Sequence, residues 1–206
     1  MAGLVEGRVA LITGGSSGIG RGTALVFARE GAKVAIADIQ VEQGQETVRL
    51  VKEAGGEAVF VKCDVSVASE VKAAVEKVVE TFGRLDCGFN NAGIESTMAK
   101  TADCTEEDWD RVMAVNLKGV WLCMKCEIPE MLKQGGGAIV NTASINGVAG
   151  VRWHEQLLRF QGRRHTADTD GGTGVCQVGH PHQRSLPRRR QYPDGQAAAE
   201  AAYDYV

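Results

Sequence analysis

The sequence predicts an α/β fold in which helices cover both faces of a doubly wound parallel sheet. Short runs rich in β-branched residues alternate with helical patterns as far as about residue 144, which is the order of repeated strand–helix units. Each run is also apolar enough to be covered on both faces, as strands of a parallel sheet are. The five predicted strands are Arg8–Thr13, Lys33–Asp38, Glu57–Lys62, Leu85–Asn90 and Ala138–Thr142.

Helical segments with recognisable starts and stops lie between these strands. Apolar residues between positions 67 and 82 recur at the spacing of one helix face. Thr105 and Asp108 are spaced as in a capping box, and the glycine run at 135–137 is a helix stop. These signals predict a long helix over about 105–133.

Composition favours a single core and a small-molecule partner. A chain of 206 residues with 44% hydrophobic content can bury one substantial core. The net charge of -3 gives no basic field for nucleic acid or an anionic membrane. No apolar run approaches the roughly 18 residues of a membrane span. We therefore expect a cytoplasmic protein without a nucleic-acid or membrane partner.

The cysteines predict neither disulfides nor a metal site. The six residues are scattered without the dense spacing of a disulfide-stapled domain. Cys123 and Cys126 form a C-x-x-C pair, but it lies in an apolar stretch that reads as helix. Buried packing is therefore favoured over redox or zinc chemistry for this pair.

A glycine-rich turn, Thr13–Gly20, follows the first predicted strand and opens a helix. Glycines permit a tight turn and close approach of a pyrophosphate, whose charge the N–H groups of the helix start can bind. Ser16 and Ser17 can add hydroxyl donors. This context predicts a Rossmann-like dinucleotide site, against the alternative of an ordinary glycine-rich turn.

Asp38 bears on which dinucleotide is bound. It ends the second strand, 18 residues after Gly20, where a carboxylate can accept hydrogen bonds from both adenosine ribose hydroxyls and would repel a 2′-phosphate. Ile39 follows it where an arginine would favour NADP. NAD is therefore the predicted cofactor, and an exposed strand-end carboxylate without this role is the alternative.

Over roughly residues 6–150 the sequence resembles the short-chain dehydrogenase/reductase family. The family pattern T-G-x-x-x-G-x-G matches Thr13–Gly20, and N-N-A-G matches Asn90–Gly93. Its Asp-Val pair beside the adenine is Asp64-Val65, its helix asparagine is Asn116, and its active-site serine is Ser144. Independently of this resemblance, strand order predicts that the carboxyl ends of strands one, four and five bring Gly14, Asn91 and Ser144 together.

The resemblance implies hydride transfer between NAD and a small secondary alcohol or ketone. It implies that Ser144 donates a hydrogen bond to the substrate oxygen and that Asn116 holds a water in a proton relay. Intact relatives are homo-oligomers through the helix over 105–133 and the next one, a state we do not expect here. The implied cofactor-binding residues are Gly14, Ser16, Ser17, Gly18, Ile19, Gly20, Asp38, Ile39, Asp64, Val65, Asn91, Ala92 and Gly93.

The family's Tyr-x-x-x-Lys pair is missing. Leu157 and Gln161 stand where the Tyr and Lys are expected, and no lysine follows Lys133. Losing a positioned acid/base costs about 10²–10⁴ in rate. We therefore expect very low activity from this chain.

From about residue 151 the composition changes, and we expect a poorly ordered tail over 151–206. Residues 154–206 hold all four histidines and no lysine or isoleucine. A frameshift explains both changes: Glu155–Gly162 can be encoded GAG CAG CTA CTC CGC TTC CAA GGC, which one nucleotide later reads Ser-Ser-Tyr-Ser-Ala-Ser-Lys. The same offset turns Gly172–Pro187 into a family-like helix and strand.

The frameshift hypothesis also accounts for two motifs in the tail. We interpret the possible zinc ligands Cys176, His180 and His182, and the basic run Arg188–Arg190, as accidents of the reading frame. Two alternative functions stay open beside the leading one. The first alternative is a non-catalytic dinucleotide-binding remnant. The second is an NADP-linked 3-oxoacyl carrier-protein reductase.

Overall fold

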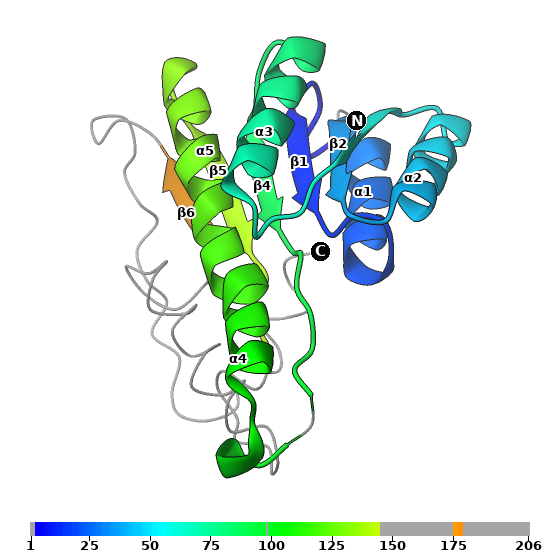
Figure 1. The fold of residues 1–206 in the computed structure, drawn as a ribbon. Coiled ribbons are helices and arrows are strands. Elements are labelled where there is room, and N and C mark those ends of the chain that lie inside the picture. Colours follow the sequence, from blue (N-terminus) through cyan, green and yellow to red (C-terminus); the bar gives the residue numbers. More distant parts are fainter. Residues whose placement is uncertain (1–2, 98, 145–174, 179–206) are drawn as a thin grey trace, which may run out of the picture.

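The computed structural model describes residues 3–97, 99–144 and 175–178. One sheet runs through this part of the chain with helices on both of its faces (Figure 1). In chain order the elements are β1 (Val9–Thr13), α1 (Gly18–Arg29), β2 (Lys33–Asp38), α2 (Val41–Glu53), β3 (Glu57–Lys62), α3 (Ala68–Phe82), β4 (Cys87–Asn90), η1 (Thr101–Asp103), α4 (Glu106–Met113), η2 (Ala114–Gly119), α5 (Val120–Lys133), β5 (Gly137–Asn141) and β6 (Val175–Val178).

The first five strands are parallel and lie in the order β3-β2-β1-β4-β5. The chain reverses its direction of winding between β1 and β4, and ligands of open α/β sheets bind at such a switch point. Thr13 pairs with Ala37 of β2 and with Asn90 of β4, and Asn90 pairs with Asn141 of β5. The doubly wound, Rossmann-like prediction is confirmed, and the carboxyl ends of these strands share one edge.

Strand bounds agree with the sequence prediction to within two residues. β4 begins at Cys87 rather than Leu85, and β1 begins at Val9 rather than Arg8. The side chain of Asp86 accepts a hydrogen bond from the Val9 N–H at 3.0 Å. A side chain thus takes the place of a ladder bond where both strands begin.

Two hydrophobic clusters, one on each face, fix the sheet between its helices. On one face Val71 and Val78 of α3 and Leu122 of α5 cover Leu11. On the other face α1 and α2 cover Ile12 and its neighbours on β2. Successive strand residues therefore point to opposite clusters, as the pleat requires, and both faces are covered as the apolar runs predict.

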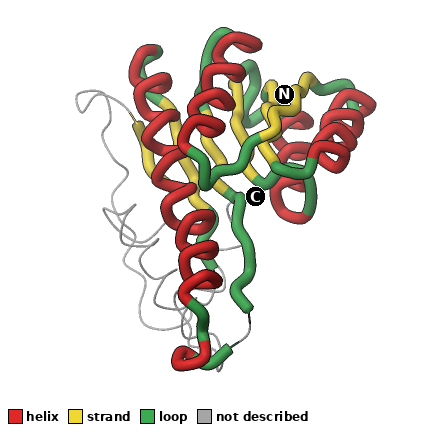
Figure 2. Tube along the Cα trace, in the orientation of Figure 1, coloured by secondary structure: helices red, strands yellow, loops and turns green. Residues whose placement is uncertain are grey.

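The predicted helix over 105–133 is continuous but not uniform. The Thr105 hydroxyl accepts a hydrogen bond from the Asp108 N–H at 3.1 Å, which confirms the predicted cap. Between α4 and α5 the helix widens into the π-helical turns of η2, a distortion often found at functional sites. In Figure 2 the loop after β4 (green) runs beside this helix. The helix ends before Gly135, whose φ is +91°.

The tail contributes one strand that the sequence did not predict. β6 pairs antiparallel with β5, with Val140 opposite Val175 and Gly137 opposite Val178. The expectation of a poorly ordered tail over 151–206 is wrong for this segment. The free edge of β5 offers unpaired backbone groups, and a short segment can pair with them without an amphipathic pattern of its own.

Among the helices of the described ranges, none is long and apolar enough to cross a membrane.

Candidate functional site

The glycine turn between β1 and α1 has the backbone conformation its sequence predicts. Gly14 and Gly18 have φ values of +66° and +52°, which side-chain-bearing residues rarely adopt. A Cβ added at Gly20 would lie 2.1 Å from the Gly14 carbonyl oxygen. Gly20 therefore lets α1 start directly against the turn.

The start of α1 opens toward solvent-accessible space. Apart from its chain neighbours and the adjacent backbone of α1, no described heavy atom lies within 4 Å of where a Cβ of Gly18 would stand. Ser17 is the N-cap, and its side chain makes no capping hydrogen bond within the described structure. The first N–H groups of a helix have no intrahelical partner, so this end of α1 is suited to an anion.

Asp38 and Ser16 join the end of β2 to the glycine turn. Asp38 Oδ2 accepts hydrogen bonds from the Ser16 N–H at 3.1 Å and from its hydroxyl at 2.6 Å. Asp38 Oδ1 accepts a third bond from the Gln40 N–H at 3.0 Å. The Ser16 hydroxyl is thus donated to Asp38. A carboxylate has about four acceptor positions, so Asp38 retains capacity for a ligand hydroxyl.

Arg21 of α1, which the sequence analysis did not single out, joins the same turn to α2. Its guanidinium donates to the Ser16 carbonyl, to Thr47 Oγ1 at 3.0 Å and to the Gln43 carbonyl at 3.4 Å. The sequence shows a basic residue directly after the glycine pattern. It does not show that the side chain turns toward α2, because that depends on how α1 and α2 pack.

Asn91 ties the ends of three strands together. Its N–H donates to Thr13 Oγ1 at 3.0 Å, and its Nδ2 donates to the carbonyls of Thr13 at 3.2 Å and Gly14 at 3.4 Å. Thr142, just after β5, donates to Asn91 Oδ1 at 3.3 Å. The predicted convergence of Gly14 and Asn91 is therefore observed as direct contact.

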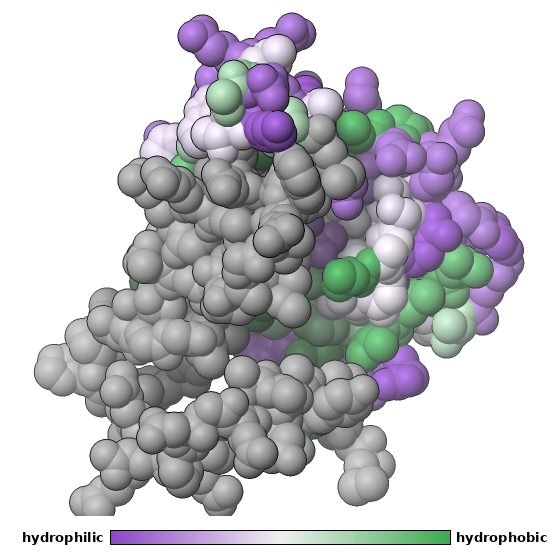
Figure 3. Space-filling view, turned by 90° about the horizontal axis from the view of Figure 1, so that it is seen from below, coloured by the Kyte–Doolittle hydropathy of each residue, from purple (hydrophilic) through white to green (hydrophobic). Residues whose placement is uncertain are grey.

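A cavity of about 650 Å³ lies at this carboxyl edge, within the range of small-molecule and cofactor sites. Ile19 and Ile39 at its rim are exposed. Figure 3 shows the molecule from below, where apolar residues (green) lie among hydrophilic ones (purple) on the surface of the described part. Every predicted cofactor-binding residue lines the cavity except Gly20, which acts behind the turn. The lining is Gly14, Ser16, Ser17, Gly18, Ile19, Ala37, Asp38, Ile39, Gln40, Cys63, Asp64, Val65, Asn91, Ala92, Gly93, Ile94, Glu95 and Val115.

The floor of the cavity beside β3 has two features. Asp64 Oδ1 accepts hydrogen bonds from the Ser66 N–H at 2.9 Å and its hydroxyl at 2.7 Å, which fixes the turn after β3. Burial raises the pKa of Cys63 to about 12, with Glu70 and Asp64 adding to the rise. The thiol is therefore neutral and is not a nucleophile in this site.

Asn116 lies in η2 and is 3% exposed. Its Oδ1 accepts from the Ile94 N–H and its Nδ2 donates to the Ile94 carbonyl, both at 2.8 Å. Its amide thus holds the loop after β4, where Gly93 and Ile94 line the cavity. The water-holding role implied by resemblance stays a prediction.

Ser144 is partly buried and follows β5 by three residues. It is not among the described residues that line the cavity, and its expected approach to Gly14 and Asn91 stays a prediction. Leu157, Gln161 and the reading-frame hypothesis concern residues outside those described.

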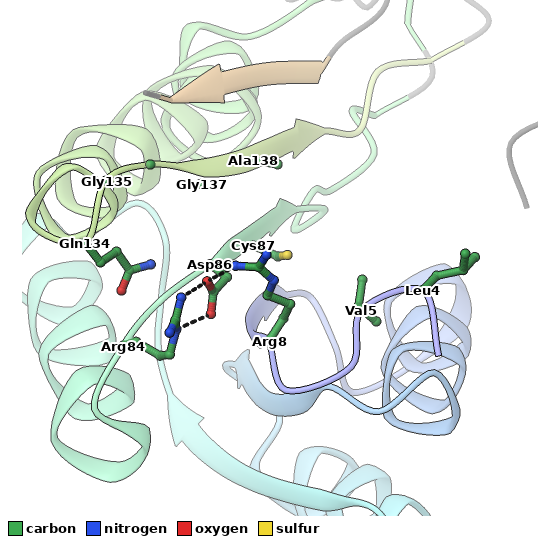
Figure 4. Close-up of a pocket in the computed structure, with 11 residues that line it drawn as sticks. Leu4, Val5, Arg8, Arg84, Asp86, Cys87, Gln134, Gly135, Gly137 and Ala138 are labelled. Carbon is green, nitrogen blue, oxygen red and sulfur yellow. Dashed lines mark hydrogen bonds and ion pairs between the residues drawn. The ribbon is translucent and has the colours of Figure 1, made fainter. Parts of the chain in front are cut away.

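A second cavity, of about 320 Å³, lies at the opposite edge of the sheet, where the strands begin (Figure 4). Arg8 and Arg84 both point toward Asp86 there, with Arg8 Nη1 at 3.0 Å and Arg84 Nε at 2.7 Å from its carboxylate oxygens. Burial opposes ionisation of Asp86, but the hydrogen bonds from Arg84, Val9 and Arg8 lower its pKa. We interpret this cluster as structural, because it joins the starts of β1 and β4.

The described residues contain no group of three or more metal-ligating side chains. Burial raises the pKa of Cys123 well above its usual value, and Glu127 adds to the rise. Burial also raises the pKa of Cys126. Cys123 lies in the core cluster and Cys126 packs partly buried against it, in agreement with the packing interpretation. His180 and His182 lie outside the described residues.

Comparison with known proteins identifies close relatives. A family model described as short chain dehydrogenase matches residues 8–155. An uncharacterized oxidoreductase of Thermotoga maritima is 51% identical over 146 residues, 71% of this chain and 57% of that protein. The cyclohexanol dehydrogenase of an Acinetobacter strain is 45% identical over 152 residues, 74% of this chain and 61% of that protein. The chain thus spans less than two thirds of the length of these relatives.

The fold has equally clear counterparts among solved structures. An NAD⁺-bound xylitol dehydrogenase aligns with a TM-score of 0.77 and 34% identity over 80% of this chain and 64% of that one. A levodione reductase aligns with a TM-score of 0.75 and 37% identity over 79% of this chain and 66% of that one.

Proposed function

This chain belongs to the short chain dehydrogenase family, and from that premise we propose that residues 1–150 bind NAD as the cofactor half of an oxidoreductase for a secondary alcohol or ketone. The observation that carries the proposal is the carboxyl-edge cavity, lined by all the predicted cofactor-binding residues except Gly20. The cavity lies at the switch point of the sheet, where open α/β folds bind dinucleotides.

The glycine turn and α1 supply the pyrophosphate site. The open space at Gly18 admits a ligand against the backbone, and the N–H groups at the start of α1 are donors for its negative charge. Because Ser16 is bound to Asp38, main-chain N–H groups rather than this hydroxyl make the principal contacts.

Asp38 supports NAD over NADP. The carboxylate is held rigidly by Ser16 and Gln40 and borders the cavity, so a 2′-phosphate would meet a fixed negative charge.

Asn116 has a different role. It is buried against Ile94, and we infer that it positions the loop that forms the cavity wall beside Gly93.

The proposed chemistry is incomplete in this chain. The bound nicotinamide would supply the hydride chemistry, and Ser144 would donate a hydrogen bond to the substrate oxygen. The proton-transfer pair expected of the family is absent, since Leu157 and Gln161 stand in its place. We therefore propose a chain that binds NAD and turns over at a rate lowered by about 10²–10⁴.

A panel of small secondary alcohols offered to the purified chain with saturating NAD tests this proposal. We expect binding, followed by fluorescence titration, and at most trace NADH production followed by absorbance. NADH production at a rate normal for the family would contradict the proposed impairment, whereas the absence of binding would contradict the cofactor assignment.

The non-catalytic remnant is the second candidate. It is favoured by the same missing pair, and a complete lack of turnover in that panel with intact NAD binding would select it. An NADP-linked 3-oxoacyl carrier-protein reductase is the third candidate function, and the charge of Asp38 disfavours it. A clear preference for NADP over NAD in titration would favour this third candidate over the NAD-linked function.

A further inference from the structure

Glu127 is a buried carboxyl that the proposed cofactor site does not use. It lies on α5 with 0% of its surface exposed and packs against β4 where Gly88 leaves room for it. A Cβ added at Gly88 would stand 2.7 Å from Glu127 Oε1. The backbone of β4 therefore lies close against that side of the carboxyl.

Glu127 belongs to a three-residue amide and carboxyl cluster. Asn90 Nδ2 donates to Glu127 Oε2 and to Asn141 Oδ1, each at 3.0 Å. The remaining oxygens of the first pair, Asn90 Oδ1 and Glu127 Oε1, are buried and have no hydrogen-bond partner among the described residues. When Glu127 is ionised both atoms are acceptors, so the pair lacks a donor, and buried polar groups are rarely left so.

We propose that Glu127 is held as the neutral acid and that its proton, donated to Asn90 Oδ1, makes Glu127 the positioning residue for the ends of β4 and β5. One proton then gives the acid and the amide a hydrogen bond in each direction. The same proton thereby accounts for Asn90 Oδ1 and Glu127 Oε1, the two buried oxygens that otherwise have no hydrogen-bond partner among the described residues.

The surroundings of Glu127 agree with a neutral acid. Burial raises the pKa of Glu127 to about 7, and the hydrogen bond from Asn90 opposes the rise. The titratable groups that interact with Glu127 on its own helix are the thiols of Cys123 and Cys126, both with raised pKa. From α3, Lys72 and Glu76 act on Cys126. No cation in the described chain compensates a charge on Glu127.

The cluster lies directly beneath the proposed site. Asn90 precedes Asn91, which clamps Gly14, and Asn141 precedes Thr142, which donates to Asn91. Ionising Glu127 puts a charge beneath these strand ends and removes the only donor available to Asn90 Oδ1 among the groups described. We therefore expect the geometry of the carboxyl edge to depend on the protonation of Glu127.

The test compares the wild-type chain with Glu127→Gln and Glu127→Met. Gln keeps a neutral group with one donor and one acceptor end, and Met keeps the volume without either. Glu130→Gln, at an ion-paired position on the same helix, is the control for removing a charge. Urea unfolding midpoints are measured from about pH 5 to about pH 8.5.

The direction follows from proton binding. An unfolded glutamate titrates near its usual 4.5 and folded Glu127 near 7, so between these values only the folded state holds the proton, and raising the pH destabilises it. Relative to Glu127→Gln, the wild-type midpoint should fall as the pH rises from about 5 to about 7 and level off above 7. Histidines contribute equally to both chains and cancel. Glu127→Met should be destabilised at every pH, and Glu130→Gln should follow the wild type.

Two results overturn the proposal: a pH slope in Glu127→Gln equal to the wild-type slope, or a midpoint for Glu127→Gln near pH 6 as low as that of Glu127→Met. Infrared difference spectra of the wild-type chain between the same pH limits give a reading that needs no variant. Ordinary carboxyls are almost fully ionised only above about pH 6, so the spectra are compared from about pH 6 upward. Loss of a protonated-carboxyl band on raising the pH is expected there, and no change in that band contradicts the proposal.

NAD titration at both ends of the pH range tests the positioning role, which rests on the proposed function. The wild-type dissociation constant should rise a few-fold at high pH relative to that of Glu127→Gln. A constant ratio with the stability result intact would remove the positioning role alone. Failure of both chains to bind NAD would instead contradict the proposed function and leave the protonation of Glu127 to the unfolding and infrared data.

Discussion

A Cβ at Gly20 would lie 2.1 Å from the carbonyl oxygen of Gly14, so these two glycines fix how closely α1 approaches the end of β1. Gly20→Ala forces them apart and should lower stability by about 2–3 kcal/mol and abolish tight NAD binding. Gly22→Ala is the matched control, because Gly22 lies exposed on the same helix and its Cβ would meet no described atom within 4 Å beyond its chain neighbours and the adjacent helix backbone. It should stabilise α1 by about 0.5–1 kcal/mol. Chemical unfolding and NAD titration measure both; equal effects of the two variants would contradict the packing argument.

Asp38→Asn should change cofactor preference. Removing the negative charge weakens the hydrogen bonds to ribose hydroxyls and lifts the repulsion of a 2′-phosphate, so NAD affinity should fall about 10-fold while NADP affinity rises. Competitive titration with both dinucleotides measures the ratio. Glu42→Gln, an exposed charge change outside the cavity, should leave the ratio as it is. An unchanged ratio in Asp38→Asn would show that Asp38 only holds Ser16.

Asn116→Ala removes both hydrogen bonds to Ile94 and leaves the backbone groups of Ile94 without those partners. Unfolding free energy should fall by about 2 kcal/mol, and NAD affinity should fall because the wall beside Gly93 loosens. Lys118→Ala, exposed in the same π-helical segment, should change neither quantity by as much. A stable Asn116→Ala with normal NAD binding would show that η2 does not hold the loop.

Asp86→Asn should destabilise the chain by about 1–2 kcal/mol near pH 7, because Arg8 and Arg84 lose a charged acceptor. The pKa of folded Asp86 lies below its usual 3.8, so the carboxylate stabilises the fold above pH 4, and this contribution disappears as the pH falls through the lowered pKa. The stability difference between wild type and variant, from urea unfolding, should be steady at neutral pH and shrink in acid. A difference that grows in acid would mean that the pKa is raised.

Much of the fold could be predicted from sequence because each strand carries its own apolar run. Lys33–Asp38 and Glu57–Lys62 were predicted with their observed bounds, since both faces of these strands are covered locally by helices. The β4 start was placed early because Asp86 replaces a backbone ladder bond, and residue type alone does not show this. β6 was missed because its pairing depends on the free edge of β5 rather than on its own pattern.

The backbone positions of the site could likewise be predicted from the strands, but its side-chain contacts could not. The carboxyl ends of parallel strands meet at one edge, so Gly14 and Asn91 could be brought together from the strand ends alone, while the same expectation for Ser144 stays a prediction. The contact between Asp38 and Ser16 could not be predicted, because it depends on side-chain direction. The cluster of Glu127 and Asn90 was invisible to sequence reasoning, since a lone glutamate in a helix usually faces solvent.

Calorimetric titration of the purified chain with NAD and with NADP tests the central claim most directly. We predict saturable binding of NAD at least about 10-fold tighter than that of NADP, because Asp38 is a fixed negative charge at the ribose end of the cavity. Equal affinities, a preference for NADP, or no saturable NAD binding by the folded chain would contradict the account.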